Sequence, residues 1–284
     1  MPTRPSTMPN RLLRLYPTPC VETPIEGLYL AHRVHELGNA EAPFVYANFL
    51  SSLDGRIAVE DTAQGTSYIP KHLTTEADFR LFMELHAQAD CLITHGGYLR
   101  ALNEGRLGNI LQVGVGPENR DLAEWRIKNG LKPQPAIIVA SASLDFPVHG
   151  SIGEFGQEIY IATGRKADPD RVRHWQKFGY KILFTGEGRL VQGAQLVRQL
   201  SALGFKSIYL IAGPHMLDTV IRERVLGRLY QTITHQLVGG EDIHTLLPGQ
   251  MRGSEGNLAL RSLYYDSVSP KGSGQFFAQF EPTD

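Results

Sequence analysis

The sequence predicts an α/β fold with a mixed, mostly parallel central sheet of about nine strands, helices on both faces and a C-terminal antiparallel hairpin. Three observations predict it. The aromatic-rich run FVYANFL at 44–50 ends at a cluster of turn residues and is typical of a buried strand. Between residues 136 and 224, short apolar runs alternate with amphipathic stretches that end at glycine, as in βαβ units. Near the C-terminus, SPKGSG at 269–274 separates two strand-like runs and indicates a hairpin.

The elements after the opening strand follow from capping and periodicity. Residues 59–71 carry turn residues and are expected to form a loop. A helix is expected over 75–88, because Thr75 and Asp78 make a capping pattern and apolar residues recur at helical spacing. The next expected strand covers 90–94.

From residue 101 to 135 the chain is expected to be less regular, apart from a helix over 119–129. The expected helices end near glycine, and two of them begin at proline; they cover 119–129, 168–179, 191–203 and 213–224. The expected strands cover 136–140, 158–162, 181–185, 207–212, 229–238, 258–265 and 275–281. Residues 1–42, with one possible short helix over 25–37, are expected to be an N-terminal extension of a single domain at 43–284.

Composition restricts the class of protein. Of the 284 residues, 42% are hydrophobic, which is enough for a large core. No apolar run approaches the ~18 residues of a spanning helix, and the basic N-terminus lacks the apolar stretch of a secretory signal. The formal net charge of −1 argues against a nucleic-acid binder. We therefore expect a soluble cytoplasmic protein with no membrane or nucleic-acid partner.

Several common sites are not predicted. Cys20 and Cys91 form no CxxC pair, and His32 and His35 lie three residues apart without a third ligand, so no metal site is expected. No GxGxxG motif opens a helix after a strand, and there is no P-loop or GxSxG motif.

Polar side chains lie together at the carboxyl end of the opening strand. It ends at Ser51-Ser52, and Asp54, Gly55 and Arg56 follow. Ligands of open α/β sheets bind at the carboxyl ends of strands, so these residues are candidates for a site. The alternative is an ordinary polar turn in which Asp54 caps its own backbone.

A second candidate lies where the strand at 207–212 meets Gly213-Pro214 and a helix begins. The first turn of a helix presents unsatisfied N–H groups and the positive end of the dipole, which favours phosphate. The alternative is that proline is simply a good helix starter.

The stretch SSLDGRIA at 51–58 resembles the signature of the RibD-type riboflavin-pathway reductases, a branch of the dihydrofolate reductase superfamily. The turn at Gly213, Pro214 and Leu217 resembles the family's E-G-G-P/A-x-L, although Ile211 and Ala212 replace its glutamate and first glycine. The resemblance implies a dihydrofolate-reductase-like fold, an NADPH cofactor, a small-molecule substrate and a homodimer.

The resemblance also implies site residues. It places the cofactor against Ser51, Tyr68, Gly96, Gly97, Ser141, Gly213, Pro214, His215, Met216 and Leu217. It places the substrate against Ser52, Thr66, His86 and Arg100, and it makes Asp54 the candidate for orienting substrate or relaying a proton. His86 stands where the family has an arginine for the substrate phosphate, and Ala142 stands where it has one that could meet the 2′-phosphate of the cofactor.

The implied function is NADPH-dependent reduction of a C=N or C=O group in a pyrimidine or related heterocycle, as in 5-amino-6-(5-phosphoribosylamino)uracil reductase of riboflavin biosynthesis. Because the substrate motifs depart from the family, two alternatives stay open. One is a dihydrofolate- or pterin-type reductase on the same fold. The other is a non-catalytic nucleotide-binding protein.

Overall fold

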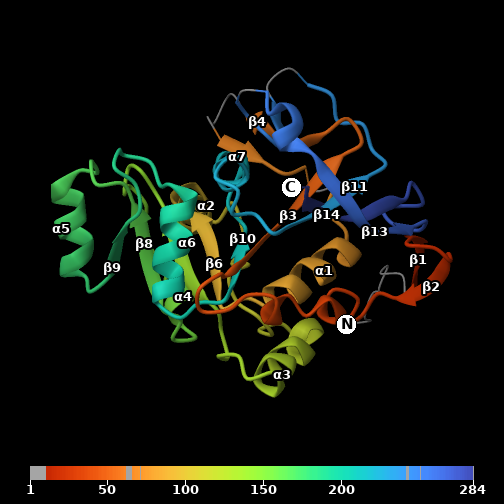
Figure 1. Cartoon of the computed structure of the whole chain (residues 1–284), viewed down its shortest axis with the longest axis horizontal. Coiled ribbons are helices and arrows are strands. Elements are labelled where there is room, and N and C mark those ends of the chain that lie inside the picture. The colour runs from red at the N-terminus through yellow and green to blue at the C-terminus, as the bar shows by residue number, and fades with distance from the viewer. Residues whose placement is uncertain (1–10, 62–65, 71, 241–242, 250, 284) are drawn as a thin grey trace. The chain divides into compact units, whose positions relative to one another are not determined.

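The computed structural model describes residues 11–61, 66–70, 72–240, 243–249 and 251–283. The chain divides into two compact units (Figure 1). Unit 1 comprises residues up to 32, 47–84 and 227–284, and unit 2 comprises 33–46 and 85–226. Strand β3 (Phe44–Ser52) begins in unit 2 and ends in unit 1.

Unit 2 is an α/β unit with a parallel run of strands in the order β10-β6-β7-β8-β9. The strands are β6 (Cys91–His95), β7 (Ala136–Ala140), β8 (Ile159–Thr163), β9 (Lys181–Phe184) and β10 (Ser207–Leu210). The helices are α2 (Gly96–Asn103), α3 (Arg120–Lys128), α4 (Gly150–Gly153), α5 (Pro169–Lys177), α6 (Gly193–Ala202) and α7 (Pro214–Arg222). Helix α5 lies beside β9 in Figure 1.

Unit 2 has the apolar strands that a parallel sheet requires. Ile93, Ile138, Ile161 and Leu210, one from each of four strands, have no solvent-exposed area. Strands covered on both faces read as continuous hydrophobic runs, which is why the sequence identified them.

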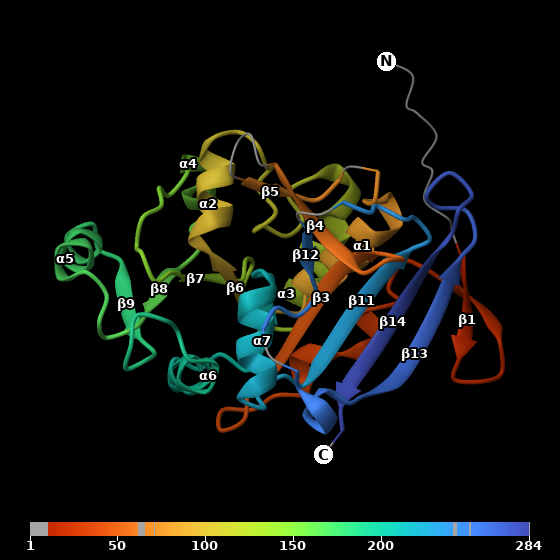
Figure 2. The same cartoon turned by 90° about the horizontal axis from the view of Figure 1, so that it is seen from above.

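Unit 1 is dominated by antiparallel strands in the order β2-β1-β13-β14-β11-β3. The strands are β1 (Arg11–Tyr16), β2 (Val21–Pro24), β11 (Arg228–Thr234), β13 (Leu258–Asp266) and β14 (Gln275–Pro282). Figure 2 shows β11, β14, β13 and β1 side by side. A small second sheet has the order β12-β4-β5, formed by β4 (Arg56–Asp61), β5 (Thr66–Tyr68) and β12 (Ile243–Thr245).

Helix α1 (Glu76–His86) begins in unit 1 and ends at the first residues of unit 2. Its predicted cap is confirmed: the backbone N–H of Asp78 donates to the Thr75 hydroxyl at 3.0 Å. Glu84, which has no solvent-exposed area, accepts hydrogen bonds from the backbone N–H groups of Gly27 and Tyr29 at 2.6 and 2.8 Å. This carboxylate ties the segment before residue 32 to α1.

The predicted α/β class, the mixed sheet and the C-terminal hairpin are confirmed. Four features of the local structure differ from the expectations. Residues 11–24 form the hairpin β1–β2, and residues 25–37 form two short 3₁₀ turns, Leu30–His32 and Val34–Glu36, instead of a helix. The expected loop at 59–71 contains the end of β4 and all of β5, and α2 was not expected.

Candidate functional site

Two helices of unit 2 begin directly at the carboxyl ends of neighbouring parallel strands. Strand β10 leads into α7 through Gly213, and β6 leads into α2, whose first residue is Gly96. The register pairs Leu210 with Ile93, and the Ile211 N–H donates to the Ile93 carbonyl at 3.0 Å, so the two strands end side by side. Two helix N-termini therefore follow neighbouring strand ends at one edge of the sheet.

Neither helix start is neutralised by a side-chain cap. Gly213 is the N-cap residue of α7 and has no side chain, and His95, the N-cap residue of α2, makes no capping bond within the described residues. Gly213 has φ −70° and ψ −177°, an extended conformation open to any residue, and a Cβ built there meets no atom within 4 Å. The backbone therefore does not require glycine at this position. The absence of a side chain leaves space over an uncapped helix start, which suits a phosphate group.

The loop after β7 reaches the same edge. The pairing of Cys91 with Ala136 places Ser141 level with Gly96. A Cβ built on Gly96 would lie 3.3 Å from the Ser141 hydroxyl oxygen and 2.9 Å from Cδ1 of Phe146, so glycine is needed for this approach. The Ser141 hydroxyl accepts a hydrogen bond from the Leu144 backbone N–H at 3.0 Å. The structure thus brings Gly96, Ser141 and Gly213 to one edge, and this edge fits the diphosphate of a dinucleotide.

The other predicted cofactor residues of unit 2 differ in how they are placed. His215 is exposed, and Pro214 and Met216 are partly exposed, so these three can contact a ligand at the α7 start. Leu217 has no solvent-exposed area and belongs to the core. A Cβ on Gly97 would lie 2.9 Å from Nδ1 of His95, so this glycine also allows close packing.

His86, predicted to meet a substrate phosphate, is fully buried in unit 2. Its ring lies edge-on to Tyr209, with 5.3 Å between centroids. Burial, together with the charge of Arg126, lowers the pKa of His86 to about 3, so the imidazole is neutral at physiological pH. A covered, neutral ring is unsuited to binding a phosphate, and we do not carry this residue into the proposed substrate site.

In unit 1, the two serines at the end of β3 are buried and bonded inside the fold. The Ser51 hydroxyl accepts from Nε2 of Gln231 at 3.1 Å, and the backbone N–H of Arg56 donates to the Ser52 hydroxyl at 3.0 Å. Ser51 therefore joins β3 to β11, and Ser52 joins it to β4.

The Asp54 carboxylate connects the turn after β3 to the backbone at residues 238 and 239. It accepts hydrogen bonds from the Ser52 hydroxyl at 2.5 Å and from the backbone N–H groups of Val238 and Gly239 at 3.2 and 2.8 Å. The bonds from Ser52 and Gly239 hold the pKa of Asp54 well below its usual range. The carboxylate is therefore ionised at neutral pH. It can fix the turn and orient a partner, but it is not a source of protons.

The remaining predicted residues of unit 1 lie in the small sheet. Thr66 and Tyr68 are the first and last residues of β5, and Tyr68 pairs with Val59 of β4. The segment just before them, 62–65, lies outside the described residues.

The sequence analysis missed an acidic group in unit 1. Asp78, on the first turn of α1, has only 9% of its surface exposed, and its Oδ1 has no hydrogen-bond partner among the described residues. Burial raises the pKa of Asp78 to about 6, although a hydrogen bond with the Thr232 side chain acts in the opposite direction. Thr232 also accepts, through its carbonyl, the Ser51 hydroxyl at 3.5 Å. A carboxyl group whose pKa is raised to about 6 therefore lies next to Thr232 of β11, whose carbonyl accepts from Ser51 at the end of β3.

The sequence held a signal for this group. Asp78 lies three residues before Leu81, which has 1% of its surface exposed, so it belongs to the buried face of α1. The sequence analysis assigned Asp78 only to the helix cap. A charged residue within an apolar stripe is uncommon without a partner and points to a special role.

No described helix is both long and apolar enough to cross a bilayer. Within the same part of the chain, no group of three or more His, Cys, Asp or Glu side chains is arranged to hold a metal ion.

Known proteins with related sequences are reductases. The chain is 24% identical over 208 residues to the 2,5-diamino-6-ribosylamino-4(3H)-pyrimidinone 5′-phosphate reductase of Archaeoglobus fulgidus, covering 73% of this chain and 87% of that protein. It is 22% identical over 211 residues to the reductase of the same name from Aquifex aeolicus, covering 74% and 84%.

Two solved structures share the fold. A pyrimidine reductase-like protein of Corynebacterium diphtheriae gives a TM-score of 0.63 at 17% identity, covering 85% of this chain and 92% of that one. The riboflavin biosynthesis reductase Rib7 of Saccharomyces cerevisiae gives 0.55 at 13% identity, covering 91% and 99%. Residues 43–267 match the family described as the RibD C-terminal domain. The chain belongs to the RibD C-terminal domain family.

Proposed function

We propose that this protein is an NADPH-dependent reductase of a phosphorylated ribosylamino-pyrimidinone or a closely related heterocycle. Reductase activity in general is supported by the named activity of the relatives from Archaeoglobus and Aquifex. The cofactor assignment rests on one observation in unit 2: the uncapped starts of α7 and α2, which follow neighbouring strand ends, with open space over Gly213.

The residues of unit 2 would hold the cofactor by its phosphates. The first turns of α7 and α2 offer backbone N–H groups to the diphosphate, and the Ser141 hydroxyl lies level with them. Bound NADPH would supply a hydride, and the chain would supply position and electrostatics.

Reduction of C=N or C=O also requires a proton at the heteroatom. We assign the holding of that proton in unit 1 to Asp78, because burial keeps the pKa of its carboxyl at about 6. Asp54, the candidate from the sequence, is assigned instead to orientation, because its hydrogen bonds keep it ionised. This division uses two carboxyl groups whose environments move their pKa values in opposite directions.

One observation favours a second candidate, a pterin-type reductase. Full burial of His86 leaves the position where the family has its phosphate-binding arginine covered by protein. A substrate without a phosphate would not need that contact.

The test is a fluorescence titration of the full chain with NADPH and NADH, followed by turnover assays. The assays would use 2,5-diamino-6-ribosylamino-4(3H)-pyrimidinone 5′-phosphate, its dephosphorylated form and dihydrofolate. Oxidation of NADPH with the phosphorylated pyrimidinone supports the first candidate, and oxidation with dihydrofolate alone supports the second. Failure of the folded protein to bind either dinucleotide would refute both. Binding without turnover of any of these substrates would identify a non-catalytic nucleotide-binding protein.

A further inference from the structure

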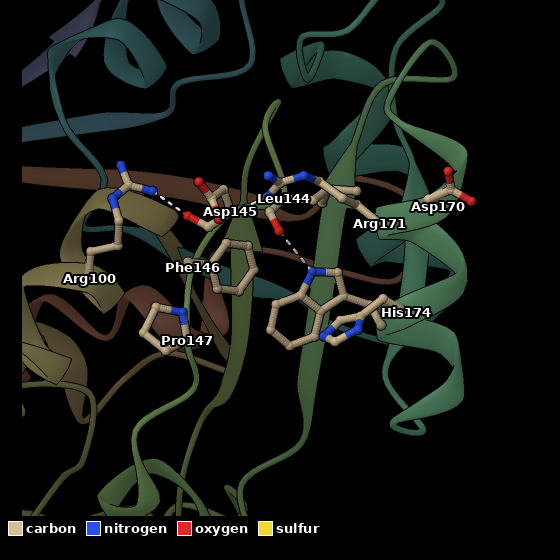
Figure 3. A pocket seen from close by; sticks show the side chains of 9 residues that line it. Arg100, Leu144, Asp145, Phe146, Pro147, Asp170, Arg171 and His174 are labelled. Carbon is tan, nitrogen blue, oxygen red and sulfur yellow. Dashed lines mark hydrogen bonds and ion pairs between the residues drawn. The ribbon is translucent and has the colours of Figure 1, made fainter.

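Unit 2 contains cavities at both edges of its parallel sheet. The larger cavity, of about 550 Å³, lies between the loop after β7 and helix α5 (Figure 3). Nη1 of Arg100 donates there to the backbone carbonyl of Asp145 at 2.5 Å. Phe146 in its wall packs so closely on Gly96, at the start of α2, that a Cβ on this glycine would lie 2.9 Å from the ring. This cavity therefore adjoins the proposed cofactor edge and belongs with the site already described.

The second cavity, of about 160 Å³, lies at the opposite edge, where the strands of unit 2 begin. Asp90 directly precedes β6, Phe205 lies two residues before β10, and residues 130–132 lie between α3 and β7. The cavity is thus at the amino ends of these parallel strands, whereas α2 and α7 follow the carboxyl ends of β6 and β10. A ligand in it would leave the cofactor edge free.

A buried cation with unused hydrogen-bond donors lines this second cavity. Arg126 is fully buried, and its Nε donates to the Lys132 carbonyl at 2.9 Å. Its Nη1 donates to the carbonyls of Ala87 and Ala89 at 2.9 and 2.8 Å. Its Nη2 makes no hydrogen bond with the described residues, although this nitrogen carries two N–H donors. Burial lowers the pKa of Arg126 to about 10, so the guanidinium is still charged at neutral pH.

The anionic group of the cavity is Asp90, which uses one carboxylate oxygen within the fold. Its Oδ2 accepts hydrogen bonds from the backbone N–H groups of Lys206 and Ser207 at 2.7 and 3.1 Å, and its Oδ1 has no such partner in the part of the chain that the structure describes. Asp90 acts on the pKa of Arg126, yet no ion pair or hydrogen bond joins the two side chains among the described residues. The cavity therefore presents a cation and an anion that do not neutralise each other by contact.

Two helices end at this cavity. Helix α3 ends at Lys128 and α6 at Ala202. Gly130 and Gly204, which follow these ends with φ of 74° and 89°, both line the cavity. The C-terminal end of a helix carries partial negative charge and favours a cationic group. The helix ends therefore add to the negative potential of Asp90.

The charges of the side chains around the cavity balance. Asp90 offsets Arg126, and Lys132, the other charged residue in the wall, is ion-paired with Glu158. A ligand with a net charge gains little from such a site. A ligand that carries both signs can meet the guanidinium with an anionic group and can meet Asp90 and the helix ends with a cationic group. The small volume limits the rest of such a ligand to a few atoms.

We propose that this cavity binds a small zwitterionic amino acid. The ligand carboxylate would accept from Nη2 of Arg126, and the ligand ammonium group would donate to Oδ1 of Asp90. A short aliphatic side chain would lie against the apolar part of the wall, formed by Leu131, Leu203 and Phe205. The inference goes beyond the proposed function and does not depend on it, because no contact with cofactor or substrate is involved.

The test is calorimetry of the full chain with L-alanine and with two analogues that each lack one charge. N-acetyl-L-alanine lacks the ammonium group, and ethylamine lacks the carboxylate. We expect L-alanine to bind with a Kd of about 1 mM and both analogues to bind at least about tenfold more weakly. Saturating NADPH should not displace L-alanine, because the cavity and the cofactor edge lie at opposite ends of the strands.

A variant and its control test the assigned contact. Asp90→Asn keeps an oxygen that can accept from the N–H groups of Lys206 and Ser207, but it removes the negative charge, so it should weaken L-alanine by about tenfold or more. Asp170→Asn is the same substitution on a carboxylate of the larger cavity, and it should leave the affinity for L-alanine unchanged.

NMR locates the ligand on the wild-type chain, so the proposal stays testable if Asp90→Asn fails to fold. Addition of L-alanine should shift the backbone amide signals of Gly130, Gly204, Lys206 and Ser207 most strongly. Unshifted signals at these positions with L-alanine at about ten times the expected Kd would overturn the proposal. So would equal binding of L-alanine and either analogue, unchanged affinity in a folded Asp90→Asn protein, or displacement of L-alanine by NADPH.

Discussion

Replacing Asp78 by asparagine tests the proposed proton-holding group through stability as well as activity. Burial raises the pKa of this carboxyl from 3.8 to about 6 in the folded state. The folded protein therefore binds the proton more tightly than the unfolded chain does. The contribution of Asp78 to stability is most favourable below about pH 4, falls as the pH rises to about 6, and stays reduced above that value.

The magnitude follows from the shift. About two pKa units at 1.36 kcal/mol each correspond to a penalty of about 3 kcal/mol at pH 7.5. Asparagine removes this penalty, but its amide N–H groups find an incomplete set of acceptors, which costs about 1 kcal/mol. We expect Asp78→Asn to be more stable than wild type by about 2 kcal/mol at pH 7.5. At pH 4 the penalty on the carboxyl is largely absent and the cost of the amide remains, so the variant should be less stable than wild type there, by up to about 1 kcal/mol.

The assay is urea unfolding of both proteins at pH 7.5 and pH 4, together with turnover of the identified substrate from pH 5 to pH 8. Asp78→Asn should lose the limb of the pH–rate profile that reports a group titrating near pH 6, and its kcat should fall by about a hundredfold. Its affinity for NADPH should not change.

Asp54→Asn is the matched control, because it is the same substitution on a carboxylate of unit 1 whose pKa is lowered instead of raised. It should destabilise the protein at pH 7.5, with the loss fading as the pH falls below the usual range of an aspartate. If Asp78→Asn destabilised the protein at pH 7.5, or left the pH–rate profile unchanged, the assignment of Asp78 as a proton-holding group with a raised pKa would be wrong.

Three further predictions concern other parts of the chain. Gly213→Val should fold, with a change in the free energy of unfolding of about 1 kcal/mol or less, because a side chain there meets open space. Calorimetry should nevertheless show at least a tenfold loss of NADPH affinity. The control Gly150→Val, at the equally open first residue of α4, should bind NADPH normally. Arg126→Ala should cost about 3 kcal/mol in urea unfolding, because the fully buried guanidinium donates to the carbonyls of residues 86, 87, 89 and 132; an unchanged midpoint would contradict this. Burial and, to a smaller extent, Arg228 lower the pKa of His32 to about 4. The contribution of His32 to stability should therefore fall by about 3 kcal/mol as the pH drops from 6.5 to 4. The variant His32→Gln should show a flatter dependence of the unfolding free energy on pH over that range.

Local patterns were enough for the elements that a short window defines. The strands at 44–50 and 207–212, of which the second is observed over 207–210, and the hairpin around residues 269–274 were predicted because apolar periodicity and turn residues act within a few positions. Helix α7 was predicted at its observed start because Pro214 at the first helical position has a backbone angle suited to a helix.

Elements that depend on distant partners were missed. Strand β1 exists because it pairs with β13, and β4 because it pairs with β12, about 185 positions further along the chain. Helix α2 begins with two glycines, which are poor helix formers, and its start is placed by close packing against Phe146 and Ser141. No local preference in the sequence reports such contacts.

The sequence by itself determined which residue types stand at strand ends and helix starts, and so the fold class and the candidate cofactor edge. Tertiary structure alone decided their chemical states. It buried His86 beside Tyr209 and Arg126, surrounded Asp54 with donors, and placed Asp78 against β11. The pKa of a side chain depends on its solvation and on charges brought close by folding, and these are set by residues far away in the sequence.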